Sequence, residues 1–126
     1  MAPTLVRKED APRFEVHGAQ VVGYASPSRG SPGLSAWRVS LDPGAQSPLH
    51  ALEGDEVFLA LRGEAEFRFA GETVRVRAGD GLTVPAGTTF AIATVGDGSF
   101  EAVACVQAGT RASVGGGAPF LPPWAS

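Results

Sequence analysis

Glycine and proline divide this chain into short segments whose residues alternate between apolar and polar. The 17 glycines and 10 prolines gather in clusters such as SPSRGSPG, RAGDG and LPP. Between the clusters lie runs with a period of two and many β-branched or aromatic residues, a pattern typical of strands. These runs are residues 13–16, 34–41, 56–62, 64–69, 73–78, 82–85, 90–95 and 100–107. Because no segment shows a sustained helical period, the pattern predicts an all-β sandwich or barrel.

Turn signals and alternation predict how these strands are connected. The segments LRGEAEF and FAGETV predict tight hairpins at residues 62–63 and 70–71. Run 56–62 is apolar on both faces, which indicates a central strand. Because side chains on one face repeat every two residues, His50 shares a face with Leu52, and Glu56 shares a face with Phe58. A hairpin between these two segments would bring Glu56 close to His50.

Length and charge exclude several classes of protein. At 126 residues the chain is long enough for one domain with its own core and too short for two ordinary ones. With a net charge of −3 and scattered basic residues, a nucleic-acid partner is not expected. No apolar window approaches the length of a membrane span, and the N-terminus lacks a signal-peptide core. The single cysteine, Cys105, cannot form an internal disulfide. We therefore expect a soluble, cytoplasmic protein without a membrane partner.

The stretch PGAQSPLHALEGDEVFLALRG, residues 43–63, carries one of the two histidines of the chain. Its Gly44, His50, Glu56 and Gly63 resemble the first motif of the cupins. That motif is a glycine, five residues, His-x-His, three or four residues, a glutamate, six residues and a glycine. Where the motif has its second histidine, this sequence has Leu52.

A second stretch, GDGLTVPAGTTFAIAT, is similar to the second cupin motif. That motif is a glycine, five residues, Pro-x-Gly, two residues, a histidine and, three residues further on, often an asparagine. Gly79, Pro85 and Gly87 stand in place, whereas Phe90 and Thr94 occupy the histidine and asparagine positions. Glycine and proline here specify turns and the end of a strand rather than chemistry.

The resemblance spans residues 43–94 and implies a single-domain, cupin-type antiparallel β-barrel, also called a double-stranded β-helix or jelly roll. We expect an N-terminal lead-in at 1–12, the barrel at 13–112 and a Gly/Pro-rich C-terminal tail at 113–126. The tail, which is similar to that of small bacterial cupins, would pack on the barrel or on a partner. Because cupin barrels commonly dimerise, the resemblance also implies a homodimer.

The metal site implied by the resemblance is incomplete. A typical metal-bearing cupin places three histidines and one glutamate around a divalent ion, but Leu52 and Phe90 carry no donor atom. Catalytic zinc sites and iron facial triads need three protein ligands. We therefore expect no cofactor, or a weakly held divalent transition metal on His50 and Glu56, with any third ligand coming from outside the motif.

Three functions from different classes remain open. The first is a cupin that binds a small, largely apolar molecule, with metal absent or weakly bound and His50 and Glu56 as polar anchors. The second is an enzyme. It is either a metal-independent isomerase, cyclase or lyase with His50 and Glu56 as the catalytic acid–base pair, or a metal-dependent dioxygenase, isomerase or lyase using His50, Glu56 and a ligand outside the motif. The third is a dimeric structural or regulatory domain without catalysis. For the first function, the residues expected to line the pocket are Leu52, Phe58, Phe90, Tyr24 and Cys105.

Two of these residues also have simpler structural interpretations. Cys105 lies in an apolar run, where a cysteine is usually a small buried residue. Tyr24, like Trp37, would serve equally well in the core or in a wall. The other histidine, His17, has no companion residue and is interpreted as a surface or edge-strand residue. The identity of the ligand, and whether a reaction occurs, do not follow from these patterns.

Overall fold

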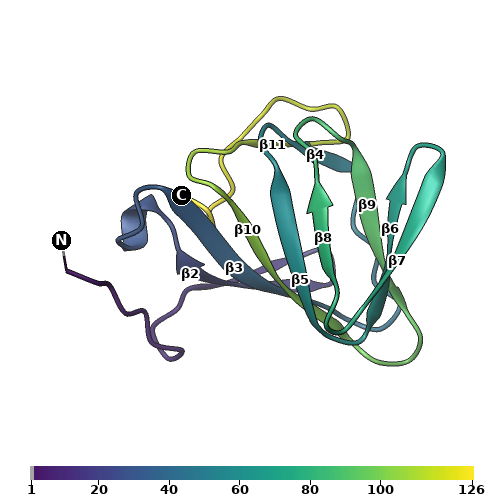
Figure 1. The fold of residues 1–126 in the computed structure, drawn as a ribbon, viewed down its shortest axis with the longest axis horizontal. Coiled ribbons are helices and arrows are strands. Elements are labelled where there is room, and N and C mark those ends of the chain that lie inside the picture. Colours follow the sequence, from purple (N-terminus) through teal and green to yellow (C-terminus); the bar gives the residue numbers. More distant parts are fainter. Residues whose placement is uncertain (1) are drawn as a thin grey trace.

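The computed structural model describes residues 2–126 as two antiparallel β-sheets packed face to face, with a short turn of 3-10 helix, η1 (Pro27–Arg29) (Figure 1). The first sheet contains, in spatial order, β1 (Arg13–Val16), β2 (Ala19–Ala25), β3 (Leu34–Leu41), β10 (Phe100–Gln107), β5 (Glu56–Arg62) and β8 (Gly81–Val84). The second contains β11 (Ala112–Val114), β4 (His50–Leu52), β9 (Phe90–Val95), β6 (Glu64–Phe69) and β7 (Glu72–Arg77). This arrangement is a jelly roll and confirms the all-β prediction.

Alternation located most of the strands well. The predicted runs coincide with β1, β3, β5, β6, β9 and β10, and the runs for β7 and β8 begin one residue late. Three strands were missed: β2, whose alternation is interrupted by Gly23, and the three-residue strands β4 and β11. Strands this short offer too few residues for a period of two to stand out.

The predicted hairpin at Arg62-Gly63 is wrong. Strand β5 pairs with β10 and β8 in the first sheet, whereas β6 pairs with β7 and β9 in the second. Gly63, at a φ of 75°, therefore marks a corner where the chain crosses between sheets. The hairpin predicted between His50 and Glu56 is wrong for the same reason, because β4 and β5 belong to opposite sheets. The hairpin at Ala70-Gly71 is confirmed by the β6–β7 pairing.

Strand β5 is central, as its sequence indicates, because it lies between β10 and β8. Glu56, Phe58 and Ala60 share its buried inner face. Its outer face is apolar but open to solvent, with Leu59 and Leu61 exposed to 53% and 54%.

Aromatic side chains fill one end of the space between the sheets. The ring of Phe67 on β6 lies 5.0 Å from that of Phe58, 6.1 Å from that of Phe90 and 6.2 Å from that of Phe100. Phe67, Phe90 and Phe100 are fully buried. Burial of aromatic side chains in edge-to-face and stacked pairs is a large part of the stabilisation of such a core.

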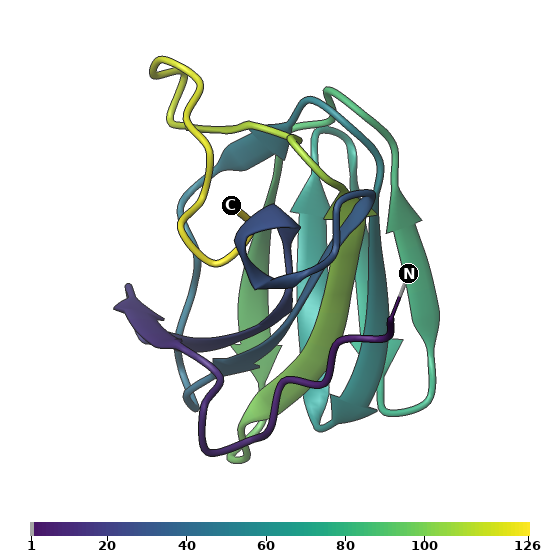
Figure 2. The same cartoon turned by 90° about the vertical axis from the view of Figure 1, so that its left-hand side faces the viewer.

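The C-terminal tail packs against the other end of the barrel. Figure 2 shows it passing from β11 down to η1. Trp124 contacts Trp37 on β3 and Phe14 on β1, with ring centroids 6.4 Å and 6.0 Å apart. The hydroxyl group of Ser35 donates a hydrogen bond of 2.7 Å to the carbonyl oxygen of Ala125. The tail therefore forms part of the wall at this end. In residues 2–126, none of the helical structure is long and apolar enough to cross a membrane.

Candidate functional site

A cavity of about 540 Å³ occupies the end of the barrel that the phenylalanines leave unfilled. Its walls come from both sheets and from the tail, and include Val21, Val39, His50, Glu56, Phe58 and Trp124. The β2–β3 part of the first sheet faces β4 across this space, while Trp124 closes one side. A volume of this size is typical of small-molecule sites.

His50 enters the cavity from β4. Its strand is held between β11 and β9, where His50 pairs with Val114 and Phe90. The ring of Phe90 lies 4.3 Å from the imidazole. Nδ1 of His50 lies 2.9 Å from the carbonyl oxygen of Pro48, which can only accept a hydrogen bond, so Nδ1 carries the hydrogen. Burial lowers the pKa of His50 below 6.5, with the Pro48 hydrogen bond opposing this effect in part. The neutral ring then offers Nε2 as an acceptor.

Glu56 enters from the opposite sheet, at the first residue of β5. It is 4% exposed, and its Oε1 atom is buried without a hydrogen-bond partner among residues 2–126. Its strand neighbours in the pairing register, Val84 and Val106, are apolar. Burial in these surroundings raises the pKa of Glu56 from 4.5 to about 8. At neutral pH the side chain is therefore mainly an uncharged carboxylic acid, able to donate as well as accept a hydrogen bond.

The rest of the cavity wall is almost entirely apolar. Within the described residues 2–126, the ionisable side chains that line it are His17, His50 and Glu56, and no lysine or arginine lines it. The nearest acidic groups along the chain are engaged elsewhere. Asp55 accepts a 2.8 Å hydrogen bond from the backbone amide of Ala86, and Glu53 forms an exposed ion pair with Arg111. This arrangement suits an uncharged ligand held by few polar contacts.

The structure brings together four of the predicted site residues: His50, Leu52, Glu56 and Phe58 all line the cavity. Phe90 lies behind this wall, in contact with His50 and within the phenylalanine cluster.

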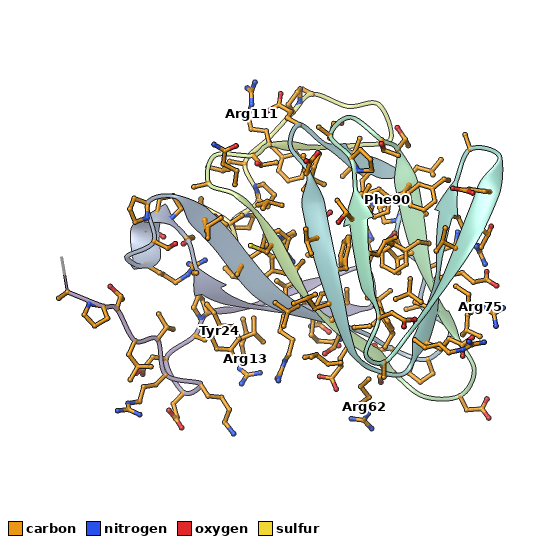
Figure 3. The ribbon with its side chains drawn as sticks, viewed as in Figure 1. Arg13, Tyr24, Arg62, Arg75, Phe90 and Arg111 are labelled. Carbon is orange, nitrogen blue, oxygen red and sulfur yellow. The ribbon has the colours of Figure 1, made fainter. Side chains whose placement is uncertain are left out.

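Tyr24 and Cys105 are not part of the cavity wall. Tyr24 is half-buried on β2, and Figure 3 places it far from Phe90. Cys105 is half-buried on β10, between the inward-facing Ala104 and Val106, and therefore points to the outer face of the sheet. The alternation of side chains along this strand indicates that Cys105 points outward, because its neighbours Ala104 and Val106 point inward.

Trp37 lies in the wall, one of the two places that its sequence position suggests. Sequence reasoning missed other residues of the wall, among them Trp124, which meets Trp37 because the tail folds back over β3. His17 lies at the cavity in the turn between β1 and β2, where it and Gly18 both have positive φ angles of 50° and 76°. A glycine between two strand-forming runs is typical of a tight turn, but it does not place that turn beside a cavity.

The donor atoms present do not fit a metal centre of the cupin kind. Two of the four motif positions carry the hydrocarbon side chains of Leu52 and Phe90. Within residues 2–126 there is no group of three or more His, Cys, Asp or Glu side chains that could hold a metal ion. His50 also has Nδ1 engaged with Pro48, so it offers one nitrogen. Two ligands from opposite sheets fall short of the three that catalytic zinc or an iron triad requires.

A comparison with protein families matches residues 37–106 to the cupin domain. This match covers more than half of the chain and includes both motif stretches. Among curated proteins, no match was found.

Solved structures with the same fold belong to several enzymes. The polyketide cyclase RemF from Streptomyces resistomycificus superposes with a TM-score of 0.79 at 15% identity, covering 97% of this chain and 89% of that one. A predicted oxalate decarboxylase from Thermotoga maritima gives a TM-score of 0.70 at 23% identity, covering 82% and 98%. Salicylate 1,2-dioxygenase from Pseudoaminobacter salicylatoxidans gives 0.71 at 21%, covering 84% of this chain and 31% of that one. At such identities these similarities show the fold alone.

Proposed function

This chain belongs to the cupin family, and from that premise we propose that its cavity binds a small, largely apolar molecule, with His50 and Glu56 as the polar anchors. The cupin fold does not by itself select this function, because one fold hosts many activities. The proposal therefore depends on the residues of this chain. Self-association as a homodimer stays a prediction and is not needed for it.

The observation that carries the proposal is the buried carboxyl group of Glu56, which lines the cavity and whose Oε1 atom has no hydrogen-bond partner within residues 2–126. A buried polar group left unsatisfied costs about 1–3 kcal/mol. A carboxyl group present at this cost in the wall of a cavity of about 540 Å³ supports a polar role for it toward a ligand. A purely structural role would be served better by a residue that packs without a polar atom.

A cavity-filling variant separates binding in the barrel from binding elsewhere. Val39 lines the cavity from β3, so the Val39→Phe variant replaces a small aliphatic side chain in the wall by a larger aromatic one. A ligand present at about 100 times its Kd stabilises the native state by about 2.7 kcal/mol. In a thermal-shift screen of small apolar compounds, we expect such a stabilisation for the wild-type protein and none for Val39→Phe.

The matched control is Val103→Phe, since Val103 lies on the half-buried outer side of neighbouring β10. This variant should bind as the wild type does. If Val39→Phe and the wild type respond equally to every stabilising compound, the cavity is not the binding site and the proposal fails.

The proposal also holds that His50 and Glu56 contact the ligand without a resident metal ion. Leu52 lines the cavity, and Phe90 lies beside His50 in the pairing register, so both occupy places where histidine would add a donor. The double variant Leu52→His with Phe90→His is expected to bind about one divalent transition metal per chain after expression with added metal. The wild-type protein is expected to retain less than about a tenth of that.

Metal content is measured by mass spectrometry of the purified proteins, before and after treatment with a chelator. Removing Phe90 from its aromatic cluster is expected to destabilise the metal-free double variant, and metal should restore part of the loss. The Leu52→Asn and Phe90→Leu pair serves as a control without imidazoles. A wild-type protein that retains one metal ion per chain would contradict this view of the site.

A further inference from the structure

The side chains that line the cavity favour an uncharged ligand. Among residues 2–126, no arginine or lysine lines the wall, and Glu56 would repel an anion if it ionised. Anionic ligands such as carboxylates need cations or several aligned amide groups to replace their hydration shell. A cationic ligand would in turn need a stable carboxylate, which these apolar surroundings disfavour. An uncharged ligand avoids both costs.

Glu56 selects for a hydrogen-bond acceptor on the ligand. Oε1 is buried without a partner, between β8 and β10, whose inward residues beside it are Val84 and Val106. Across the cavity, the titratable side chains in the wall are His50 and His17, and no ion pair or hydrogen bond joins either to Glu56 within residues 2–126. A carboxyl group without a cation keeps its proton, and a ketone oxygen is a good acceptor for it.

His50 selects for a hydrogen-bond donor. Its Nδ1 hydrogen is committed to the carbonyl oxygen of Pro48 at 2.9 Å, so Nε2 of the neutral ring can only accept. A hydroxyl group on the ligand satisfies this atom, whereas an ether oxygen at the same position cannot. The O–H group of Glu56 and Nε2 of His50 therefore favour opposite hydrogen-bonding groups, and the two side chains reach the cavity from opposite sheets.

The apolar wall adds a preference for flat rings. Trp37, Phe58 and Trp124 contribute aromatic surface to the same cavity. Aromatic side chains stack on ring systems, and such contacts contribute beyond the area that they bury. The volume of about 540 Å³ accommodates more than one ring.

We propose that the ligand is an uncharged aromatic or fused-ring ketone that also bears a hydroxyl group, with the Glu56 carboxyl group donating to the ketone oxygen and Nε2 of His50 accepting from the hydroxyl. This inference rests on the proposed function and deepens it, because it states which groups the two anchors recognise. The proposed ligand class also differs from the small organic anions that a site lined with cations would bind.

Four matched compounds test the inference: an acetylnaphthol, its methyl ether, the corresponding ethylnaphthol without the ketone oxygen, and the corresponding hydroxynaphthoic acid. Dissociation constants are measured by titration calorimetry at about pH 6.5, where the naphthoic acid is ionised. We expect the acetylnaphthol to bind at least about 10-fold more tightly than each of the other three, since one lost hydrogen bond in a buried site has roughly this effect.

Variants assign the two contacts. In Glu56→Leu the preference for acetylnaphthol over ethylnaphthol should disappear, while Glu56→Gln, whose amide still donates a hydrogen bond, should keep it. In His50→Leu the preference for acetylnaphthol over its methyl ether should disappear, while the preference for the ketone remains. Thermal unfolding of each free variant establishes that it is folded before binding is measured.

The outcomes distinguish this inference from the proposed function. If the four compounds bind the wild-type protein but not Val39→Phe, yet show no ketone or hydroxyl preference, the cavity binds apolar molecules and the inference is overturned. Tighter binding of the naphthoic acid than of the acetylnaphthol overturns it as well. If none of the four binds and the wider apolar screen also finds no ligand, both proposals fail together.

Discussion

The Glu56→Gln variant is expected to be more stable than the wild-type protein near pH 8 and about equally stable near pH 4.5. Burial raises the pKa of Glu56 from 4.5 to about 8, so the folded protein keeps a proton that the unfolded chain has already released. Between these two pH values the folded state binds more protons than the unfolded state, and the free energy of unfolding therefore falls as the pH rises. Glutamine does not ionise and removes this dependence.

At lower pH, His50 has the opposite effect on how the free energy of unfolding depends on pH. Burial lowers its pKa below 6.5, so the folded state favours the neutral ring, and the stability that this contributes is lost as the pH falls below 6.5. Above that pH the imidazole is neutral in both states, which leaves Glu56 as the dominant buried group. From pH 6.5 to about 8 we expect the wild-type free energy of unfolding to fall by about 2 kcal/mol.

Urea unfolding at a series of pH values measures this effect. The control is Glu72→Gln, because Glu72 is exposed on β7 and its replacement should leave the wild-type pH dependence intact. If the stabilities of the wild type and Glu56→Gln run parallel from pH 6.5 to 8, Glu56 is not held as a buried acid. A compound that binds in the cavity should also change how the free energy of unfolding depends on pH. The direction depends on whether the compound contacts the protonated or the ionised form of Glu56.

The Gly63→Ala variant is expected to lose more than about 3 kcal/mol of stability or to fail to fold. Gly63 forms the corner between the two sheets at a φ of 75°, a conformation that side chains with a Cβ atom rarely adopt. A Cβ atom there would also overlap the carbonyl oxygen of Ser99 and lie 3.1 Å from Cα of Phe100. Both neighbours are backbone atoms, so neither can move aside without displacing the start of β10.

Gly71→Ala is the matched control. Gly71 has a similar φ of 87°, but a Cβ atom there would meet no heavy atom within 4 Å. This variant should lose only the roughly 1–2 kcal/mol of the left-handed conformation itself. The measurement is chemical denaturation of both variants beside the wild type. Equal losses would show that the close approach of β10 to the corner has no energetic consequence.

Local patterns in the sequence predicted most of the fold because strands and turns are local properties. The alternation in residues 100–107 marks which side chains of β10 are buried, and the structure has Phe100, Ala102, Ala104 and Val106 inside. The failure at Arg62-Gly63 has a clear physical reason. A glycine with positive φ serves equally well in a hairpin and in a corner between sheets, and only the pairing of distant strands distinguishes them.

The candidate site was predicted in part. The positions of His50, Leu52 and Glu56 followed from motif spacing, and Phe58 followed from sharing a face with Glu56. The sequence pattern does not fix the direction of Tyr24 or Cys105 relative to the pocket, and the structure has both side chains outside the cavity wall. Trp124 could not be placed, because its contact with Trp37 depends on how the tail returns over the barrel.

The sequence by itself determined an all-β chain and the two stretches that resemble the cupin motifs, because both depend on residue type, period and spacing. Only the tertiary structure decided that His50 and Glu56 come from opposite sheets, that the tail forms part of the cavity wall and that Oε1 of Glu56 has no partner within residues 2–126. Burial and hydrogen bonding depend on residues far apart in the chain. The burial that raises the pKa of Glu56 to about 8 is therefore a property of the folded protein.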